Sequence, residues 1–243
     1  MKRAVVLLLL GLVGSVAATP GAAGADQQPV VLAAASLTEV LPRLESDARY
    51  SFAGSNQLAQ QIRQGAPFDV FLSASPIYAQ DLFHDGLVRK PVAFATNSLV
   101  LIVPRSNPER IRTVFDLAKR PGLRLVVAAP RVPIGLYTRE VLKRLGLLRV
   151  LKKTVSLEPD VKGIVGKVAL GEADAGFVYR TDVRPVAKKV AAISLPRRSQ
   201  PTVVYEAAIA SDPLSLENAQ GFLNELLSPT GRRILKAASF GVP

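Results

Sequence analysis

The sequence predicts an α/β protein of two lobes with a cleft between them. Short apolar runs alternate with helical stretches almost to the end of the 243 residues, which is typical of an α/β architecture. Two apolar runs, 98–104 and 202–210, are longer than most of the others and suit crossings between the lobes. These two observations predict the fold class.

The predicted strands are apolar runs that end at residues favouring turns. The first, 30–35, is uniformly apolar and opens with two valines, as expected of a buried parallel strand. The other strands are predicted at 49–53, 68–73, 98–104, 123–128, 173–179 and 202–210.

The predicted helices lie between these strands and carry terminal signals. Pro76 opens one helix, and Gly86 lies just beyond its last residue, His84. Helices are predicted at 38–47, 56–64, 76–84, 113–119, 135–145, 161–170, 215–227 and 230–239.

The two long runs divide the chain into lobes. One lobe is expected to comprise 29–104 together with 202–243, and the other 105–201. Two crossings between the lobes form a hinge, and the cleft lies between the lobes. Each lobe would hold about 100 residues, an ordinary size for a compact unit.

The first 25 residues have the pattern of a secretory signal peptide. Lys2 and Arg3 precede a short apolar run, and small residues follow it, with cleavage expected after Ala25 or, alternatively, after Ala18. The chain has no cysteine, which excludes disulfides, a cysteine nucleophile and a lipid anchor on an N-terminal cysteine. We therefore expect an exported, periplasmic protein.

The formal charge of +12 first suggests a nucleic-acid partner. The basic residues are scattered, however, and aromatic residues are few. A solvated basic surface that steers anions is the better interpretation, and no nucleic-acid partner is expected.

The sequence gives little support to enzyme chemistry. His84 is the single histidine and lies at a predicted helix end, where a surface role is expected. No G-x-S-x-G, G-x-G-x-x-G or Walker motif is present, so a triad and a nucleotide cofactor are unsupported. Glu172 and Asp174 could form a carboxylate pair, although a solvated turn before a strand is the better interpretation.

Two serines occupy equivalent places in successive strand–helix units. Ser36 follows the strand 30–35, and Ser55 follows 49–53 through Gly54. Each serine can cap the following helix, or can meet an anion at the carboxyl end of its strand, where open α/β sheets bind ligands. The repetition favours the anion.

Three more residues of the second lobe are candidate donors. Ile134 lies at a helix start, and the Val161 N–H is free next to Asp160, a good N-cap. Tyr179 ends the strand 173–179 and is either a core residue or a hydroxyl donor beside the cleft.

Several short motifs, in order, resemble the ModA family, the molybdate-binding proteins of bacterial ATP-driven transporters. The matching segments cover essentially the whole mature length: AAASLTEV (33–40), SFAGSNQLAQQI (51–62), GAPFDVFLSAS (65–75), NSLVLIVP (97–104), VPIGLYTREVL (132–142), GEADAGFVYRTD (171–182) and SPTGRRIL (228–235) with a final FG (240–241).

The resemblance implies a type II solute-binding fold and a site for a tetrahedral dianion. Ser36, Ser55 and Tyr179 would supply hydroxyls, and Ile134 and Val161 would supply backbone N–H groups. Molybdenum would be held as its oxyanion, without direct protein ligands or a cofactor. Ile134 departs from the alanine more usual there, and a shortened lead-in places Arg131 near the cleft, solvated or in contact with the anion.

The proposed contacts are all donors, which suits a fully ionised anion. Phosphate near neutral pH keeps a proton part of the time and needs an acceptor, so it is disfavoured by about 1–3 kcal/mol. Only the resemblance favours molybdate over sulfate, and tungstate should be accepted as well.

The expected function is capture by closure of the lobes and delivery to a membrane permease by a monomeric carrier. The alternatives are a sulfate or other oxyanion carrier and an exported enzyme that uses Glu172 and Asp174.

Overall fold

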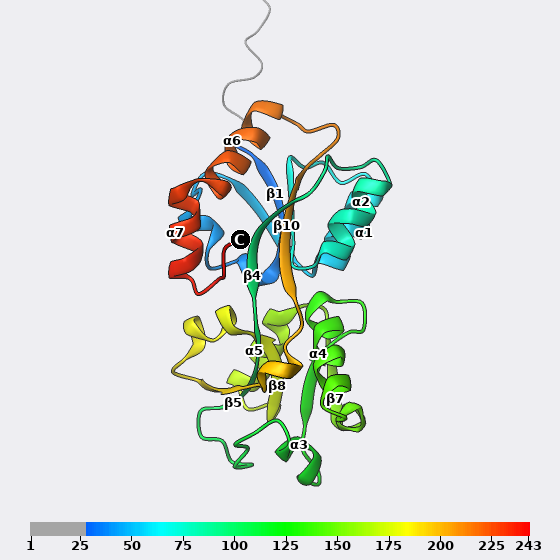
Figure 1. Cartoon of the computed structure of the whole chain (residues 1–243), viewed down its shortest axis with the longest axis vertical. Coiled ribbons are helices and arrows are strands. Elements are labelled where there is room, and N and C mark those ends of the chain that lie inside the picture. Colours follow the sequence, from blue (N-terminus) through cyan, green and yellow to red (C-terminus); the bar gives the residue numbers. More distant parts are fainter. Residues whose placement is uncertain (1–27) are drawn as a thin grey trace, which may run out of the picture.

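The computed structural model describes residues 28–243, which form two five-stranded sheets flanked by helices (Figure 1). The predicted signal peptide, with its cleavage site, lies outside the described residues. The two-lobed α/β fold is confirmed: one sheet belongs to the upper lobe in Figure 1 and the other to the lower lobe.

The first sheet has the strand order β2-β1-β3-β10-β4. Strands β1, β2 and β3 are parallel, whereas β10 runs antiparallel to both β3 and β4. The bounds are β1 Val30–Ala34, β2 Arg49–Ala53, β3 Val70–Ser73, β4 Val92–Asn97 and β10 Val203–Ile209. The carboxyl ends of the three parallel strands therefore meet at one edge of the sheet.

The second sheet repeats this plan with the order β7-β6-β8-β5-β9. Strands β6, β7 and β8 are parallel, and β5 is antiparallel to β8 and β9. The bounds are β5 Leu99–Pro104, β6 Leu125–Ala128, β7 Thr154–Glu158, β8 Ala175–Tyr179 and β9 Val190–Ser194. Each lobe thus has its own edge of parallel-strand carboxyl ends.

Helices cover the sheets of both lobes. In the first lobe, α1 Ser55–Arg63 and α2 Pro76–His84 lie on one side, and α6 Leu216–Leu227 and α7 Pro229–Ala237 lie on the other (Figure 1). The second lobe has α3 Asp116–Lys119, α4 Pro133–Arg144 and α5 Val161–Ala169. Within 28–243, no helix has both the length and the apolar character needed to cross a membrane.

The helices α4 and α5 end in the same way. Gly146 and Gly171, just beyond their carboxyl ends, have φ values of +68° and +74°. This left-handed conformation is the common helix terminator, and it favours glycine because glycine has no Cβ. The two glycines fix where the chain turns back toward β7 and β8.

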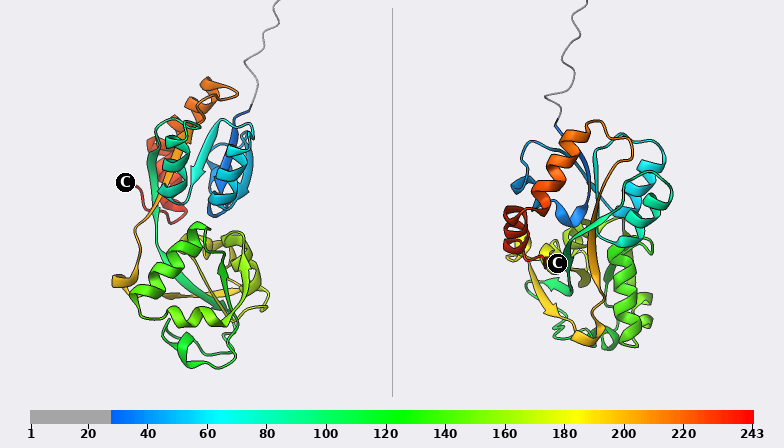
Figure 2. Two further views of the ribbon diagram at one scale, coloured as in Figure 1. Left: turned by 90° about the vertical axis from the view of Figure 1, so that its right-hand side faces the viewer. Right: turned by 45° about the horizontal axis from the view of Figure 1, so that its top comes forward.

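The chain passes from one lobe to the other twice, first from β4 to β5 and later from β9 to β10. Both connections run along the same side of the molecule (Figure 2, left). The first crossing is at Ser98, since β4 ends at Asn97 and β5 starts at Leu99. The predicted lobe boundary at residue 104 is therefore wrong, because β5 pairs with β8 and β9 of the second sheet.

The predicted helix 38–47 is also wrong. The segment forms the short 3₁₀ turns Ala35–Leu37 and Leu41–Arg43 instead. Pro42 explains the difference, because a proline inside a helix removes one backbone hydrogen bond and clashes with the preceding turn.

Three strands were not predicted, namely β4, β7 and β9. All three lie at sheet edges and are partly exposed: exposed residues alternate along β7 and β9, whereas in β4 the first two residues are exposed. An edge strand therefore lacks the continuous apolar run that marks the central strands of a parallel sheet. The other predicted strands and helices are present, with ends shifted by up to three residues.

Candidate anion-binding site

One small cavity lies between the lobes and brings together all five predicted contact residues. It has a volume of about 20 Å³, where a single water needs about 10–15 Å³. Its walls are Ala34, Ala35, Ser36, Ala53, Gly54, Ser55, Ala74, Val132, Pro133, Ile134, Asp160, Val161 and Tyr179. The cavity suits one small group and no larger ligand.

The first lobe contributes two serines from neighbouring strand ends. Ser36 lies just after β1 and Ser55 just after β2, and the two strands are parallel neighbours with Ala34 opposite Ala53. This register carries both hydroxyls to the same sheet edge. The side chains are buried, with residue exposures of 5% and 1%.

Neither serine caps a helix. Ser36 lies inside a 3₁₀ turn whose first flanking residue is Ala34, and Gly54 rather than Ser55 is the N-cap of α1. The Ser55 Oγ instead accepts a hydrogen bond of 3.0 Å from the Ala74 N–H. A capping role therefore does not account for either hydroxyl.

The second lobe contributes the amino ends of α4 and α5. Pro133 opens α4 without an N–H, so Ile134 carries the first donor of this helix, and it has no acceptor within the helix. The Ile134 side chain packs in the main apolar core, which leaves the backbone to serve the cavity. The departure from alanine at this position is thereby accommodated.

Asp160 leaves one donor free at the start of α5. Its Oδ1 accepts hydrogen bonds from the N–H groups of Lys162 and Gly163, at 2.7 and 3.1 Å. The N–H of Val161 comes before both and is not used by the cap. Asp160 is the one acidic residue among the described residues that line the cavity, and its carboxylate is engaged by this cap.

Tyr179 ends β8 and lines the cavity. The residue is 2% exposed, and its hydroxyl has no hydrogen-bond partner within residues 28–243. Burial raises the pKa of Tyr179 well above its ordinary value, so the phenol keeps its proton and can donate it. A buried donor without a partner is costly, which points to a ligand.

The lobes are in contact around this cavity. The Tyr137 hydroxyl of α4 donates to the Ala74 carbonyl of the first lobe at 3.4 Å, and the Tyr78 hydroxyl of α2 donates to the Arg131 carbonyl. The Arg184 guanidinium reaches the Ala237 carbonyl at 2.6 Å. The conformation is thus a closed one.

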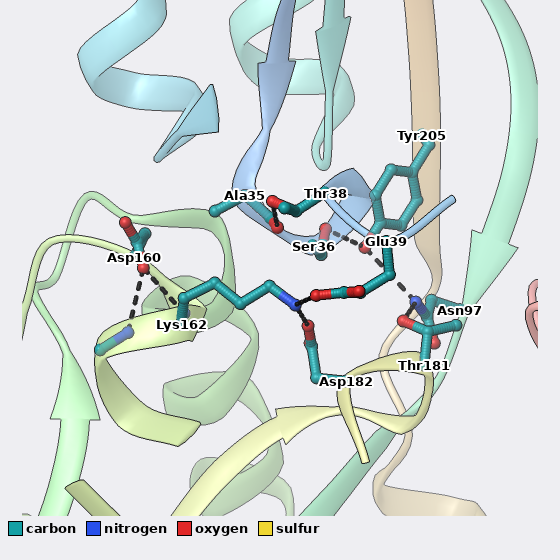
Figure 3. Close-up of polar contacts among 11 residues, drawn as sticks. Ala35, Ser36, Thr38, Glu39, Asn97, Asp160, Lys162, Thr181, Asp182 and Tyr205 are labelled. Atoms are coloured by element: carbon teal, nitrogen blue, oxygen red, sulfur yellow. Dashed lines mark hydrogen bonds and ion pairs between the residues drawn. The ribbon is translucent and has the colours of Figure 1, made fainter. Parts of the chain in front are cut away.

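An ionic cluster lies beside the cavity at the start of α5 (Figure 3). Lys162 Nζ is 3.4 Å from Asp182 Oδ1 and 3.7 Å from Glu39 Oε1, and Glu39 belongs to the other lobe. Burial raises the pKa of the Asp182 carboxyl to about 6, with the Lys162 ammonium opposing the shift. The sequence reasoning missed this cluster, because its three members are far apart in the chain.

The structure separates the other sequence candidates from the cavity. Arg131 is exposed and does not line the cavity, which favours the predicted solvated side chain over contact with the anion. His84 is the exposed last residue of α2. Asp174 is paired with Arg124 at 2.7 Å, and Glu172 lies 3.4 Å from Lys167. The predicted solvated turn fits the exposed Glu172 but is wrong for Asp174, which is buried, and neither carboxylate lines the cavity.

Comparisons with known proteins agree with this architecture. The family model for the bacterial extracellular solute-binding protein matches residues 22–241. The chain is 35% identical to the molybdate-binding protein ModA of Mycobacterium tuberculosis (strain ATCC 25618 / H37Rv), covering 98% of this chain and 95% of that protein. It is 31% identical to the molybdate-binding protein ModA of Escherichia coli (strain K12), covering 93% of each.

A solved structure gives the same result in three dimensions. The periplasmic molybdate-binding protein of Azotobacter vinelandii superposes with a TM-score of 0.79 and 25% identity, covering 89% of this chain and all of that one. The matches to both sequence and fold extend over nearly the whole length. The chain therefore belongs to the family of bacterial extracellular solute-binding proteins, among its ModA members.

Proposed function

We propose that this protein captures molybdate, and tungstate equally well, in the cavity between its lobes and delivers it to the permease of an ABC transporter. The observation that carries the proposal is the donor set. The five residues that would supply three hydroxyls and two helix-terminal N–H groups all line one small cavity. The names of the relatives support molybdate as the anion.

The donor set is suited to an anion that carries no proton. Molybdate, tungstate and sulfate are fully ionised near neutral pH and can accept a hydrogen bond at every oxygen. Hydrogen phosphate needs an acceptor for its proton, and the one carboxylate among the described cavity residues is that of Asp160, whose Oδ1 already accepts two backbone N–H groups. The unmade hydrogen bond costs about 1–3 kcal/mol, which is a several-fold to hundredfold loss of affinity.

The electrostatics of the site also favour a dianion. The two helix amino termini direct partial positive charge at the cavity from the second lobe. The donors come from both lobes, so the ion completes its coordination only when the lobes meet. Binding therefore favours the closed state, and the permease would recognise that state.

The mechanism needs neither catalysis nor a cofactor. The cavity residues hold and release an intact ion, and the carrier works as a periplasmic monomer. A leader removed during export fits this location.

Thermal unfolding of the mature protein with molybdate, tungstate, sulfate or phosphate tests the proposal. At a thousandfold excess over Kd, binding should add about 4 kcal/mol, which raises the midpoint by about 10 °C for a chain of this size. The expected result is a rise with molybdate and tungstate only. A rise with sulfate alone would replace the ligand, and no rise with any of the four would refute an oxyanion carrier.

A further inference from the structure

A chain of hydrogen bonds runs from Ser36 through Tyr205 to Asn97, and neither Tyr205 nor Asn97 lines the cavity (Figure 3). We propose that Tyr205 and Asn97 are positioning residues that fix the Ser36 hydroxyl as a donor toward the bound anion. The inference rests on the proposed function, since it explains how the site comes to present protons alone.

The chain joins three side chains of the first lobe. Ser36 Oγ lies 2.9 Å from the Tyr205 hydroxyl oxygen, and Asn97 Nδ2 lies 3.4 Å from that same oxygen. Tyr205 is completely buried in β10, and Asn97 is the last residue of β4, next to the crossing. Tyr205 does not line the cavity, so it acts on an anion only through Ser36.

The direction of the chain is set by the amide of Asn97. Its Oδ1 accepts a hydrogen bond of 2.9 Å from the Ser98 N–H, which places Nδ2 on the other side. Nδ2 has two protons and faces two oxygens: Thr181 Oγ1 at 3.0 Å and the Tyr205 hydroxyl at 3.4 Å. Asn97 is therefore a donor to Tyr205.

The direction of the hydrogen bond from Asn97 to Tyr205 determines where the hydroxyl protons of Tyr205 and Ser36 point. Among residues 28–243 the Tyr205 hydroxyl contacts Asn97 Nδ2, which is a donor, and Ser36 Oγ, so Ser36 is the acceptor for the single Tyr205 proton. Ser36 likewise has one proton, and the oxygen that carries it already accepts from Tyr205. The Ser36 proton is then left for the cavity.

The same principle operates at the second serine without a side-chain relay. Ser55 Oγ accepts from the Ala74 N–H, so its own proton is also left for the cavity. A serine hydroxyl is ordinarily both donor and acceptor, and could accept a hydrogen bond from hydrogen phosphate. Hydrogen bonds from behind reduce this freedom at both serines, which makes Tyr205 and Asn97 determinants of specificity.

Asn97→Asp reverses the direction without changing the shape of the side chain. The aspartate cannot donate a hydrogen bond to the Tyr205 hydroxyl and instead accepts a hydrogen bond from it. Ser36 must then donate to Tyr205 and present a lone pair to the anion. We expect the Kd for molybdate, measured by titration calorimetry, to rise about 30- to 100-fold.

Because the new charge also repels the anion, the double variant Asn97→Asp/Tyr205→Phe is the decisive control. It carries the same charge but lacks the middle link, so Ser36 regains its free proton. The double variant should bind molybdate at least about fivefold more tightly than Asn97→Asp alone. Equal or weaker binding by the double variant would overturn the relay.

Tyr205→Phe alone provides a second test if the charged variants do not fold. Ser36 becomes free to turn, so molybdate binding should weaken about threefold to tenfold. Phosphate should displace molybdate at a lower phosphate-to-molybdate ratio than in the wild type. An unchanged ratio would contradict the relay, because a merely structural defect weakens both anions together.

Tyr50→Phe is the matched control for Tyr205→Phe. Its hydroxyl donates to the carbonyls of Leu41 and Glu45, in the same lobe but away from the cavity. This variant should keep the wild-type Kd for molybdate and the wild-type phosphate-to-molybdate ratio at which phosphate displaces molybdate. If the wild type binds none of the anions, the proposed function fails; if it binds molybdate and only the variants disagree, the relay alone fails.

Discussion

Gly54 and Pro159 meet across the closed cleft so closely that a Cβ on Gly54 would lie 2.6 Å from the Pro159 carbonyl oxygen. Gly54 belongs to the first lobe and precedes α1, whereas Pro159 belongs to the second lobe and precedes the Asp160 cap. The glycine therefore permits an approach between backbones that any other residue would block.

Gly54→Ala should obstruct closure and leave the fold intact. The backbone angles of Gly54, φ −61° and ψ 135°, are ordinary for alanine, so the free energy of unfolding without anion should change by less than about 1 kcal/mol. The Kd for molybdate should rise at least about tenfold, measured by calorimetry. Gly221→Ala, where an added Cβ meets nothing within 4 Å, is the control. Unchanged affinity in Gly54→Ala would show that closure does not require this contact.

Ser36→Ala and Ser55→Ala should each weaken molybdate binding about 10- to 100-fold, the usual worth of a hydrogen bond to a charged group. Ser55→Ala also leaves the buried Ala74 N–H without its acceptor, which should destabilise the protein by about 1–3 kcal/mol. Calorimetry and denaturant unfolding separate the two effects. The control is Ser46→Ala, an exposed change in the same lobe, which should alter neither the molybdate affinity nor the free energy of unfolding. Wild-type affinity in both Ser36→Ala and Ser55→Ala would mean that the anion binds elsewhere.

Tyr179→Phe should weaken molybdate binding without destabilising the protein. The hydroxyl has no hydrogen-bond partner among residues 28–243, so its removal should leave the unliganded protein as stable as before or up to about 1 kcal/mol more stable. Affinity for molybdate should fall about tenfold or more. Tyr50→Phe should do the opposite, because that hydroxyl holds two carbonyls and touches no anion. A clear loss of stability in Tyr179→Phe would mean that its hydroxyl has a structural role.

Asp182 should make stability fall as pH rises. Its pKa is raised from 3.8 to about 6 by burial, with Asp160 adding to the rise and Lys162 opposing it. The folded state thus binds a proton more tightly than the unfolded state, so the contribution is complete below about pH 4 and is lost as pH rises through about 6. The loss amounts to about 3 kcal/mol.

The measurement is denaturant unfolding of the wild type and of Asp182→Asn between pH 4 and pH 7. Other carboxyls titrate in the same range, so the difference between the two proteins is the relevant quantity. The wild type should lose stability relative to Asp182→Asn as pH rises. A relative gain would contradict the raised pKa.

The sequence predicted the central elements well because burial leaves a clear pattern. Strands β1, β3, β6 and β8 are fully or almost fully buried and read as apolar runs. The edge strands β4, β7 and β9 lack such buried runs, since part of each strand faces solvent. The lobe boundary at 104 failed for a related reason: composition shows that 98–104 is buried, but not in which sheet.

The five cavity residues could be predicted because each lies at the end of a strand or the start of a helix. The contacts of Tyr205 and Asn97 behind these residues could not be predicted. Tyr205 is 169 residues from Ser36, and Asn97 is 84 residues from Thr181, so no local spacing joins these pairs. Sheet pairing brings them together: β3 lies between β1 and β10 and so links Ser36 to Tyr205, and β5 pairs with β8, Leu99 opposite Tyr179, which brings Asn97 to Thr181.

Titration calorimetry of molybdate into the wild type and into a Ser36→Ala/Ser55→Ala double variant tests the central claim most directly. The account predicts one anion per chain in the wild type. In the double variant binding should weaken by about two orders of magnitude or more, because two charge-assisted hydrogen bonds are lost. Undiminished binding in the double variant, or no binding in the wild type, would contradict the assignment of this cavity as the molybdate site.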